Sequence, residues 1–211
     1  MKKLDIVYED EEVLVLNKES NLLTIATEKE KNKTLYHYCR EYLNRKNEKI
    51  FIVHRLDKDT SGIVIFAKSI RVKTILQKEF ERREVLRKYE CVVKERLKED
   101  YHKLVKQYLF FDKKSGLSVP TKDKRKGKEA ITEFKFSSLT DEGSCLDITI
   151  FTGRQNQIRA ALKTLSLTLL GDKKYAKDNS SFMHLNFYHL SFKAGVLKKK
   201  NTFEIKRKFI A

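Results

Sequence analysis

The 211-residue sequence is poor in cysteine and has no long apolar run. Its three cysteines, Cys39, Cys91 and Cys145, lie far apart and include no Cys-x-x-Cys pair, so neither a disulfide framework nor a zinc knuckle is indicated. No apolar run has the length of a membrane span, and the opening residues become acidic too early for a signal-peptide core. We therefore expect a cytoplasmic protein without a membrane partner, whose cysteines are small buried side chains.

Acidic residues are also scarce relative to basic ones. Lysine and arginine total 46 against 29 aspartates and glutamates, which gives a formal net charge of +17 and a pI of about 9.7. Such an excess is typical of a protein that binds a polyanion, because each neutralised phosphate releases counterions. Nucleic acid is the first candidate partner, and a surface that is merely rich in lysine is the plain alternative.

Hydrophobic periodicity predicts many strands and a few helices. Apolar–polar alternation indicates strands over residues 4–18, 86–93, 104–111, 130–136, 145–151 and 182–210, the last with a basic turn at residues 198–200. Helical spacing indicates helices over residues 34–46, 70–83 and 152–166. Thr34 is the expected cap of the first helix, and Thr152 and Gln155 have capping-box spacing at the start of the last. Because strands dominate and helices are interspersed, we expect an α+β fold.

Two segments differ from this pattern. GIVIFAK at residues 62–68 is uniformly apolar, which predicts a strand buried on both faces. Residues 113–129 hold the only proline and many cations, which is typical of a mobile basic loop, or of a solvated linker. Its candidate phosphate-binding residues are Lys122, Lys124, Arg125, Lys126 and Lys128, and the basic residues of 198–200 and 206–208 are further candidates.

The stretch HRLDKDTSGIVIFAKS, residues 54–69, places Asp57 among basic residues. Its carboxylate is a candidate salt-bridge partner, metal ligand or catalyst. Asp57, Asp59 and Ser61 match the first positions of a calcium loop, but Lys68 stands where a bidentate glutamate is required, so we expect no metal. The loop exits one strand and precedes a buried one, and such loops display side chains from a rigid platform. A carboxylate near an arginine stays ionised at neutral pH, which suits a nucleophile or a base.

This stretch resembles the central motif of the RluA-type family of RNA pseudouridine synthases. That motif runs His-Arg-Leu-Asp, two variable residues, Thr-Ser-Gly and then Ala-Lys, and each of those residues is present. IVYEDEEVLVLNK, RKYECVV, TGRQNQIRAAL, GDKKYA and HLNFYHLSF are similar to other segments of the family. The sequence departs from the family at Glu19 and Asn21, in place of proline and glycine, at Asn156 and Ala161, in place of histidines, and at Ala176, in place of glycine.

The resemblance implies a pseudouridine synthase-like fold. We expect a central, mixed but mostly antiparallel, bent sheet flanked by helices and loops, with an active-site cleft across the middle. Residues 1–211 would form a single catalytic domain, either as one body or as two lobes around that cleft. Because the family pattern begins near residue 4, we expect no S4 RNA-binding domain before it.

The resemblance also implies the reaction. Such an enzyme breaks the N1–C1′ bond of a uridine, turns the base and rejoins it through C5, with Asp57 as the essential carboxylate. Attack on C1′, attack on the base at C6 and removal of a sugar proton all stay open as routes. No cofactor is implied. The expected partner is transfer RNA or large-subunit ribosomal RNA, bound by a monomer, and the target base must be flipped out of its stack.

By the same resemblance, Tyr89 stacks on the flipped uracil, Arg159 pairs with Asp57 and Arg55 fills the vacated stack. Without the family match, a core tyrosine and a surface arginine are the plain alternatives. The other expected substrate-binding residues are His54, Arg154, Gln157 and Ile158. One rival function is a non-catalytic RNA-binding protein or RNA chaperone on the same fold, and another is a ribosome-associated basic protein without a pocket.

Overall fold

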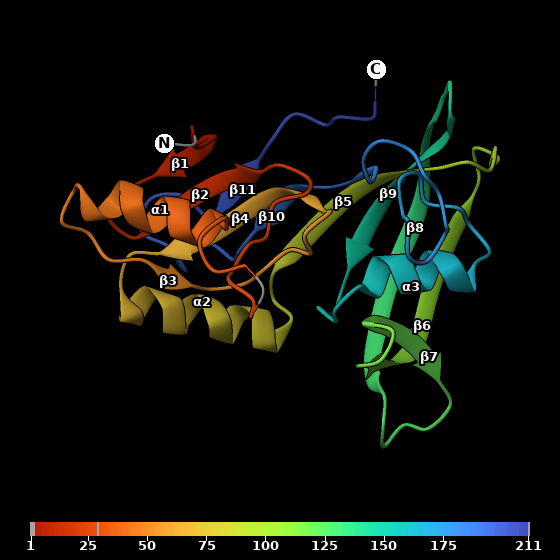
Figure 1. Ribbon diagram of the computed structural model, residues 1–211, viewed down its shortest axis with the longest axis horizontal. Coiled ribbons are helices and arrows are strands. Elements are labelled where there is room, and N and C mark those ends of the chain that lie inside the picture. The colour runs from red at the N-terminus through yellow and green to blue at the C-terminus, as the bar shows by residue number, and fades with distance from the viewer. Residues whose placement is uncertain (1–2, 29, 211) are drawn as a thin grey trace. The chain divides into compact units, whose positions relative to one another are not determined.

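The strand expected to be buried on both faces is β4 (Ser61–Ala67), and each of its seven residues is buried in the computed structural model. The structure describes residues 3–28 and 30–210 (Figure 1). Within them the chain folds into two units. The first extends to Leu86 and takes in Phe187–Lys206, and the second comprises Arg87–Asn186 and the segment from Arg207.

The first unit is organised around β4. Its other strands are β1 (Ile6–Glu9), β2 (Val13–Lys18), β3 (Phe51–Ile52), β10 (Leu185–Ser191) and β11 (Thr202–Glu204). The strand β2 pairs antiparallel with β4 and with β1, and β3 also pairs with β4. On its other side β4 neighbours β10, which pairs with β11. The predicted strand pair at residues 4–18 is therefore confirmed.

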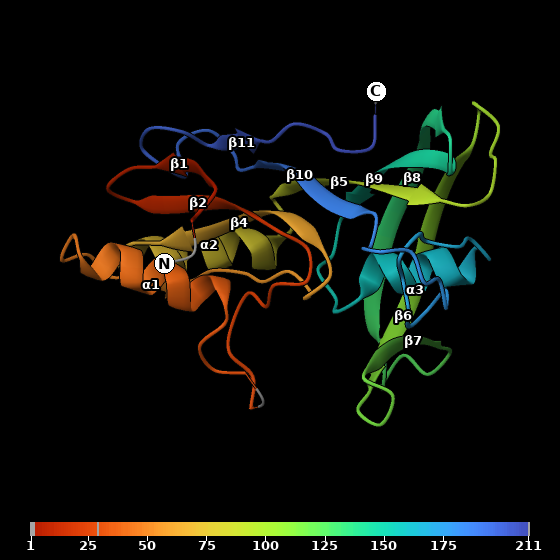
Figure 2. The ribbon, with the colours of Figure 1, turned by 45° about the horizontal axis from the view of Figure 1, so that its top comes forward.

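Two capped helices cover one side of this sheet. They are α1 (Leu35–Asn44) and α2 (Ile70–Arg82), and both lie below β2 and β4 in Figure 2. Thr34 caps α1 by accepting a hydrogen bond from the His37 amide, as predicted, and Ser69 does the same for α2. A serine or threonine hydroxyl at this position satisfies an amide that has no partner within the helix.

The second unit is an antiparallel sheet with one helix packed on it. Its strands are β5 (Leu86–Val93), β6 (His102–Asp112), β7 (Leu117–Thr121), β8 (Lys128–Thr140) and β9 (Gly143–Ile150). They are ordered β5-β9-β8-β6-β7. The helix α3 (Gln157–Thr164) lies against β6, β7 and β8, where Leu109, Ala130, Ala160 and Tyr175 form a buried cluster.

The prediction of a loop over residues 113–129 is wrong for its middle part. Residues 117–121 form β7, which pairs with β6 so that Pro120 stands opposite Leu109. Proline lacks an amide donor and is tolerated in β7 because this strand is at the edge of the sheet. Residues 122–127 connect β7 to β8, and together with Lys128, the first residue of β8, they are called the basic turn below. The Asp123 carbonyl closes the turn by accepting the Lys126 and Gly127 amides.

The predicted start of the last helix is also wrong. The helix α3 begins at Gln157, and its cap residue Asn156 has a left-handed backbone (φ 52°) and forms no capping hydrogen bond. The Thr152 hydroxyl accepts the Ile131 amide at 2.9 Å and donates to Gln157 Oε1 at 2.7 Å. Long-range bonding to β8 therefore uses the hydroxyl that the capping-box pattern assigned to the helix.

Three further expectations concern the cysteines, the strands of residues 182–210 and membrane-spanning segments. Cys39, Cys91 and Cys145 are free and buried, as predicted, and burial raises the pKa of Cys39 to about 12. Of residues 182–210, only those in β10 and β11 form strands among the described residues. None of the helices in residues 3–28 and 30–210 is long and apolar enough to cross a membrane.

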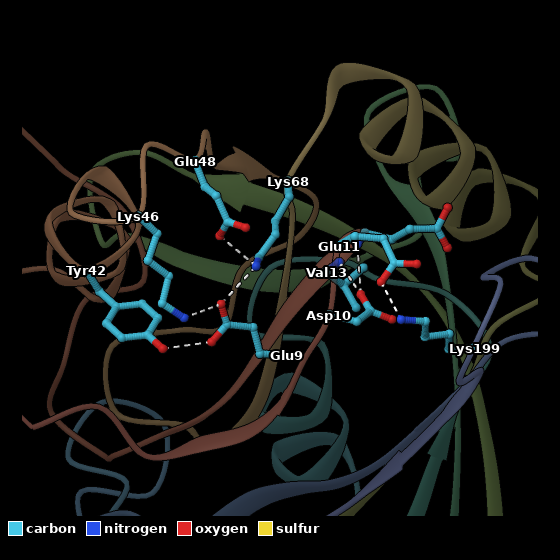
Figure 3. A network of polar contacts seen from close by, with 10 residues as sticks. Glu9, Asp10, Glu11, Val13, Tyr42, Lys46, Glu48, Lys68 and Lys199 are labelled. Atoms are coloured by element: carbon cyan, nitrogen blue, oxygen red, sulfur yellow. Dashed lines mark hydrogen bonds and ion pairs between the residues drawn. The ribbon is translucent and has the colours of Figure 1, made fainter.

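An ion-pair network at the end of β1 fastens α1 to the sheet (Figure 3). The Glu9 carboxylate accepts hydrogen bonds from the Tyr42 hydroxyl at 2.7 Å and from the Lys46 and Lys68 ammonium groups at 2.8 Å. Lys68 also pairs with Glu48 at 2.7 Å. Lys68 closes the Ala-Lys end of the central motif, so this part of the motif has a structural role.

The acidic turn after β1 holds a basic segment of the same unit. Asp10 fixes the turn by accepting the Glu12 amide at 2.8 Å. Glu11 pairs with Lys199 at 2.7 Å, and the Glu12 carboxylate accepts the Lys198 amide at 2.8 Å. Lys199, one of the sequence's candidate phosphate-binding residues, is therefore already bound to a carboxylate.

We expect Glu9→Gln to lower the free energy of unfolding by about 1–2 kcal/mol at pH 7, because it removes the charge that two lysines share. Burial alone would raise the pKa of Glu9, but hydrogen bonds from Lys46, Lys68 and Tyr42 lower it from 4.5 to about 2. The contribution is therefore complete above pH 4.5 and is lost as the pH falls toward 2.

Urea unfolding at pH 7 and at pH 3 measures this effect. The matched control is Glu11→Gln, which removes an exposed carboxylate with a single lysine partner from the neighbouring position. The control should shift the midpoint much less. An effect of Glu9→Gln that is as large at pH 3 as at pH 7 would contradict the assignment.

Candidate active site

Asp57 lies in the loop that joins β3 to β4 in the first unit. Its side chain is half-buried, and its backbone carbonyl accepts the Thr60 amide at 3.2 Å, which closes a turn. Arg55 is exposed two residues earlier. The loop therefore presents both side chains from a fixed turn rather than from a regular element.

Thr24 holds the residue before Asp57 from both sides. Its hydroxyl donates to the Leu56 carbonyl at 2.8 Å and accepts the Leu56 amide at 3.1 Å. Both Thr24 and Leu56 are buried, so these bonds replace the contacts that water would otherwise supply. The backbone next to the carboxylate is consequently fixed although it belongs to no strand.

The buried ammonium of Lys18 binds the other side of the same loop. Lys18 is fully buried, and its Nζ donates to the carbonyls of Glu19 (2.9 Å), Leu22 (2.8 Å) and Lys58 (3.0 Å). An ammonium group has three donors, so these three acceptors compensate the cost of removing it from water. Lys58 directly follows Asp57, so the end of β2 fixes the position of the catalytic candidate.

Two departures from the family pattern are compatible with this geometry. Asn21 stands where the family has glycine and has φ 65°, a left-handed conformation that asparagine adopts more readily than most residues. Glu19 stands where the family has proline and contributes its carbonyl to Lys18, which proline also carries. Both replacements therefore keep the backbone groups that hold the loop.

Gly62 of the Thr-Ser-Gly motif allows two strands to approach closely. Its φ is 117°, and a Cβ at this position would lie 2.2 Å from the Phe187 carbonyl oxygen. Every other amino acid would both strain the backbone and collide with β10. This glycine is required by packing within the first unit.

His54, expected to bind substrate, has structural partners in the first unit. Its Nε2 accepts the Ile65 amide at 3.2 Å, which requires the tautomer with the proton on Nδ1. Its ring centroid lies 5.1 Å from that of Phe80 and 6.2 Å from that of Phe187. These contacts tie the start of the motif to β4 and α2.

Arg159 and Asp172 form a buried, bidentate pair in the second unit. Arg159 Nε donates to Oδ2 at 2.8 Å and Nη2 to Oδ1 at 2.6 Å. The carboxylate also accepts the amides of Lys174 and Tyr175 at 3.0 Å. Burial alone would raise the pKa of Asp172, but the Arg159 guanidinium and these amides outweigh it and lower the pKa.

Tyr175 completes the support of Arg159. The guanidinium carbon lies 4.9 Å from the centroid of the Tyr175 ring, within the range of a cation–π contact. The Tyr175 hydroxyl accepts the Ser118 amide at 2.7 Å and donates to the Ser118 carbonyl at 2.9 Å. Arg159 is therefore held in one orientation by a segment that is tied to β7.

The other expected substrate-binding residues of this region have internal partners. Gln157 binds the Ile131 carbonyl at 3.0 Å and accepts the Arg154 amide at 3.0 Å, in addition to its bond with Thr152. Arg154 Nε donates to the Glu129 carbonyl at 2.9 Å. Ile158 is buried in the apolar stripe of α3. These contacts fix the loop before α3 on β8.

Tyr89 lies on β5 opposite Ile148 of β9, and only 7% of it is exposed. Arg87, two residues earlier, is buried too, and burial lowers its pKa.

The phosphate-binding candidates of the basic turn are all exposed: Lys122, Lys124, Arg125, Lys126 and Lys128. In contrast, Arg207 pairs with Glu90 and Asp147.

The expected site residues are divided between the two units. Asp57, Arg55 and His54 belong to the first unit, whereas Tyr89 and Arg159 belong to the second, together with residues 154–158. Residues 3–28 and 30–210 bring together no group of three His, Cys, Asp or Glu side chains that could hold a metal ion.

Sequence reasoning missed Lys18, Thr24, Asp172 and Tyr175 as supports of the site. Lys18, Asp172 and Tyr175 lie in segments that the sequence analysis found similar to the family, and this similarity could have indicated them. Thr24 had none, because its partner Leu56 is 32 positions away in the sequence.

Comparison with known proteins identifies the family. The family model described as RNA pseudouridylate synthase matches residues 12–164, which include the central motif and Arg159. The chain belongs to the RNA pseudouridylate synthase family. The family resemblance of the sequence is therefore confirmed.

The match extends to individual members of the family. The chain is 32% identical over 213 residues to ribosomal large subunit pseudouridine synthase D of Borreliella burgdorferi, covering 98% of this chain and 64% of the relative. It is 31% identical over 222 residues to an uncharacterized RNA pseudouridine synthase of Helicobacter pylori, covering 96% of this chain and 66% of the relative. The chain thus spans slightly less than two thirds of the length of these relatives.

The solved structure of human RNA pseudouridylate synthase domain containing 4 matches with a TM-score of 0.78 and 20% identity, covering 96% of this chain and 88% of that chain. At this identity the match bears on the fold alone. It confirms the expected pseudouridine synthase-like fold.

We expect Thr24→Val to lower the free energy of unfolding by about 1–3 kcal/mol, because it leaves the buried amide and carbonyl of Leu56 without partners. Amide hydrogen exchange in residues 55–60 should accelerate more than exchange in β4. The control is Thr74→Val, which removes an exposed hydroxyl bonded only to the Ile70 carbonyl of its own helix. Unchanged exchange in residues 55–60 would show that Thr24 does not hold the loop.

We expect Asp172→Asn to destabilise the second unit by about 3–5 kcal/mol, because Arg159 would remain buried without its counter-charge. Urea unfolding followed by tyrosine fluorescence measures the loss. The double variant Arg159→Met/Asp172→Leu should recover part of it, since it removes both charges. A double variant that is less stable than Asp172→Asn would contradict this reading of the pair.

Proposed function

We propose that this protein is an RNA pseudouridine synthase that converts specific uridines into pseudouridine with Asp57 as the essential carboxylate. One observation carries the proposal: the aspartate of the family's central motif lies in a loop that is fixed by hydrogen bonds within the first unit. Lys18 and Thr24 bind backbone groups of this loop, and the Ser20 hydroxyl donates to the Asp59 carbonyl at 2.6 Å. Such preorganisation is what a reacting group requires.

The reaction needs no redox change. The N1–C1′ bond of uridine breaks, the base turns, a C5–C1′ bond forms, the hydrogen of C5 is released as a proton and N1 takes up a proton. The oxygen atoms of Asp57 can act by attack on C1′, by attack on C6 or by removal of a sugar proton. Each route requires the ionised carboxylate.

The other family residues receive roles that are part of the proposal. Tyr89 stacks on the uracil, and Arg159 orients the carboxylate. The fixed orientation of Arg159 by Asp172 and Tyr175 supports such a role, because a preorganised guanidinium loses little entropy when it binds. Arg55 is exposed and free of a strand, as a side chain that enters an RNA stack must be.

Large-subunit ribosomal RNA is the first candidate substrate, with transfer RNA second. The name of the Borreliella burgdorferi relative supports this order. The rival function, a non-catalytic RNA-binding protein on the same fold, predicts tight binding without turnover.

Tritium release from RNA labelled at uridine C5 tests the proposal. The wild type should release tritium from unmodified ribosomal or transfer RNA, offered separately, and Asp57→Asn should reduce the rate by at least about 1000-fold while RNA affinity stays within a few-fold. Asp59→Asn, in the same loop, is the matched control and should retain most of the activity. An active Asp57→Asn enzyme would refute the assignment, and binding of both RNAs without any release would favour the rival.

A further inference from the structure

The outer face of the second unit's sheet carries an unusual set of exposed side chains. Residues that stand opposite each other on antiparallel strands share a face. Tyr108 stands opposite Thr121, Phe110 opposite Val119, and Lys106 opposite Ile131. We call the resulting group the β6 platform: Leu104, Lys106, Tyr108, Phe110, Val119 and Ile131.

The apolar members of this platform are open to solvent. The exposed fractions are 51% for Leu104, 43% for Phe110 and 37% for Val119. The alternate residues of β6, such as Val105 and Leu109, are buried toward α3, which lies in front of β6 and β8 in Figure 1. The platform therefore faces away from α3, and an exposed aromatic and aliphatic patch of this kind marks a binding surface.

Cations border the platform on several sides. Lys106 is exposed in its middle, and Lys124 of the basic turn lies with Nζ 5.6 Å from the centroid of the Tyr108 ring. Exposed Lys113 and Lys114 occupy the turn between β6 and β7. The carboxylate of Asp112, the last residue of β6, accepts the Lys114 and Ser115 amides and so holds this turn.

The carboxylates of this face do not reverse its charge. Glu133 stands opposite Leu104 and pairs with His102 at 2.8 Å and with Lys135 at 3.1 Å. Glu129 stands opposite Tyr108 and directly follows Lys128 of the basic turn. The platform thus combines flat apolar side chains with a positive border, which complements a chain of bases and phosphates better than it complements an average protein surface.

The edge strand argues against a partner that adds a strand. The strand β7 has five residues, and Pro120 near its end has no amide to offer a new neighbour. Short edges and prolines are devices that prevent strand addition. An occupant must therefore bind to the face of the sheet, through side chains.

We propose that the β6 platform is a second RNA-contact surface, which binds unpaired nucleotides of the substrate by stacking bases on Phe110 and Tyr108 and holding phosphates with Lys106 and Lys124. The proposal rests on the proposed function, because it takes RNA as the substrate. It goes beyond that function by adding a surface on elements that carry none of the Asp57 motif.

The test measures fluorescence anisotropy of a short, labelled, unstructured RNA with the full chain. Phe110→Leu keeps the apolar bulk but removes the aromatic face, so it should weaken binding about 5- to 100-fold. Phe110→Tyr keeps the ring and should bind like the wild type. The control Phe182→Leu removes a similarly exposed ring (47%) from the same unit and should not change the affinity.

Two variants, each of which removes one lysine charge, test the phosphate contact. Lys106→Gln should reduce the slope of log affinity against log salt by about 0.7. Its control is Lys103→Gln, an exposed lysine of the same strand that stands opposite Phe134 on the α3 side. A slope that falls equally in both variants would overturn the role of Lys106, because it would show only general electrostatic attraction.

The outcomes separate this proposal from the proposed function. Equal RNA affinity of the wild type, Phe110→Leu and Phe110→Tyr would overturn the platform. Unchanged affinity combined with altered sedimentation of Phe110→Leu would assign the surface to contact between copies of this chain instead, which also overturns the proposal. With an active enzyme, Phe110→Leu should raise KM and leave kcat unchanged. If no RNA is turned over, the proposed function fails, and the anisotropy series still decides the platform.

Discussion

The position of Asp57 depends on one buried ammonium group. The loop between β3 and β4 has little regular hydrogen bonding, so its shape must be imposed by neighbours. Lys18 is the last residue of β2, opposite Gly62 of β4, and its three hydrogen bonds reach both sides of the loop. A buried cation is stable only when all its donors are used. The requirement that keeps Lys18 satisfied therefore also keeps the loop in one conformation.

The second unit uses the same physical principle with the charges exchanged. Asp172 is the buried group, and it is satisfied by Arg159 and by the amides of Lys174 and Tyr175. Asp172 lies in a loop and Arg159 in a helix, so the pair couples irregular chain to regular structure. In both units a buried charge near the motif residues supplies the order that strands and helices do not.

Local patterns predicted the elements whose determinants are local. The cap at Thr34 and the buried strand β4 depend on residues within a few positions of one another. The predictions at Thr152 and around Pro120 were wrong because β8 and β6 take the decisive hydrogen bonds from far away in the sequence. For the same reason the resemblance could indicate Asp57 and Arg159, whereas Thr24, a distant support of the same site, could not be found by pattern.

The net charge of +17 is the difference between many charged residues, and some of the cations are paired with carboxylates of their own unit. The acidic residues of the first unit bind cations of their own unit: Glu9 binds Lys68, and Glu11 binds Lys199. In the second unit Glu90 and Asp147 bind Arg207. The basic turn adds five exposed cations, and its Asp123 carboxylate accepts the Arg125 amide and thereby stabilises the turn. The exposed lysines beside the β6 platform, such as Lys113, Lys114 and Lys124, add positive charge at that face, and positive charge attracts a polyanion.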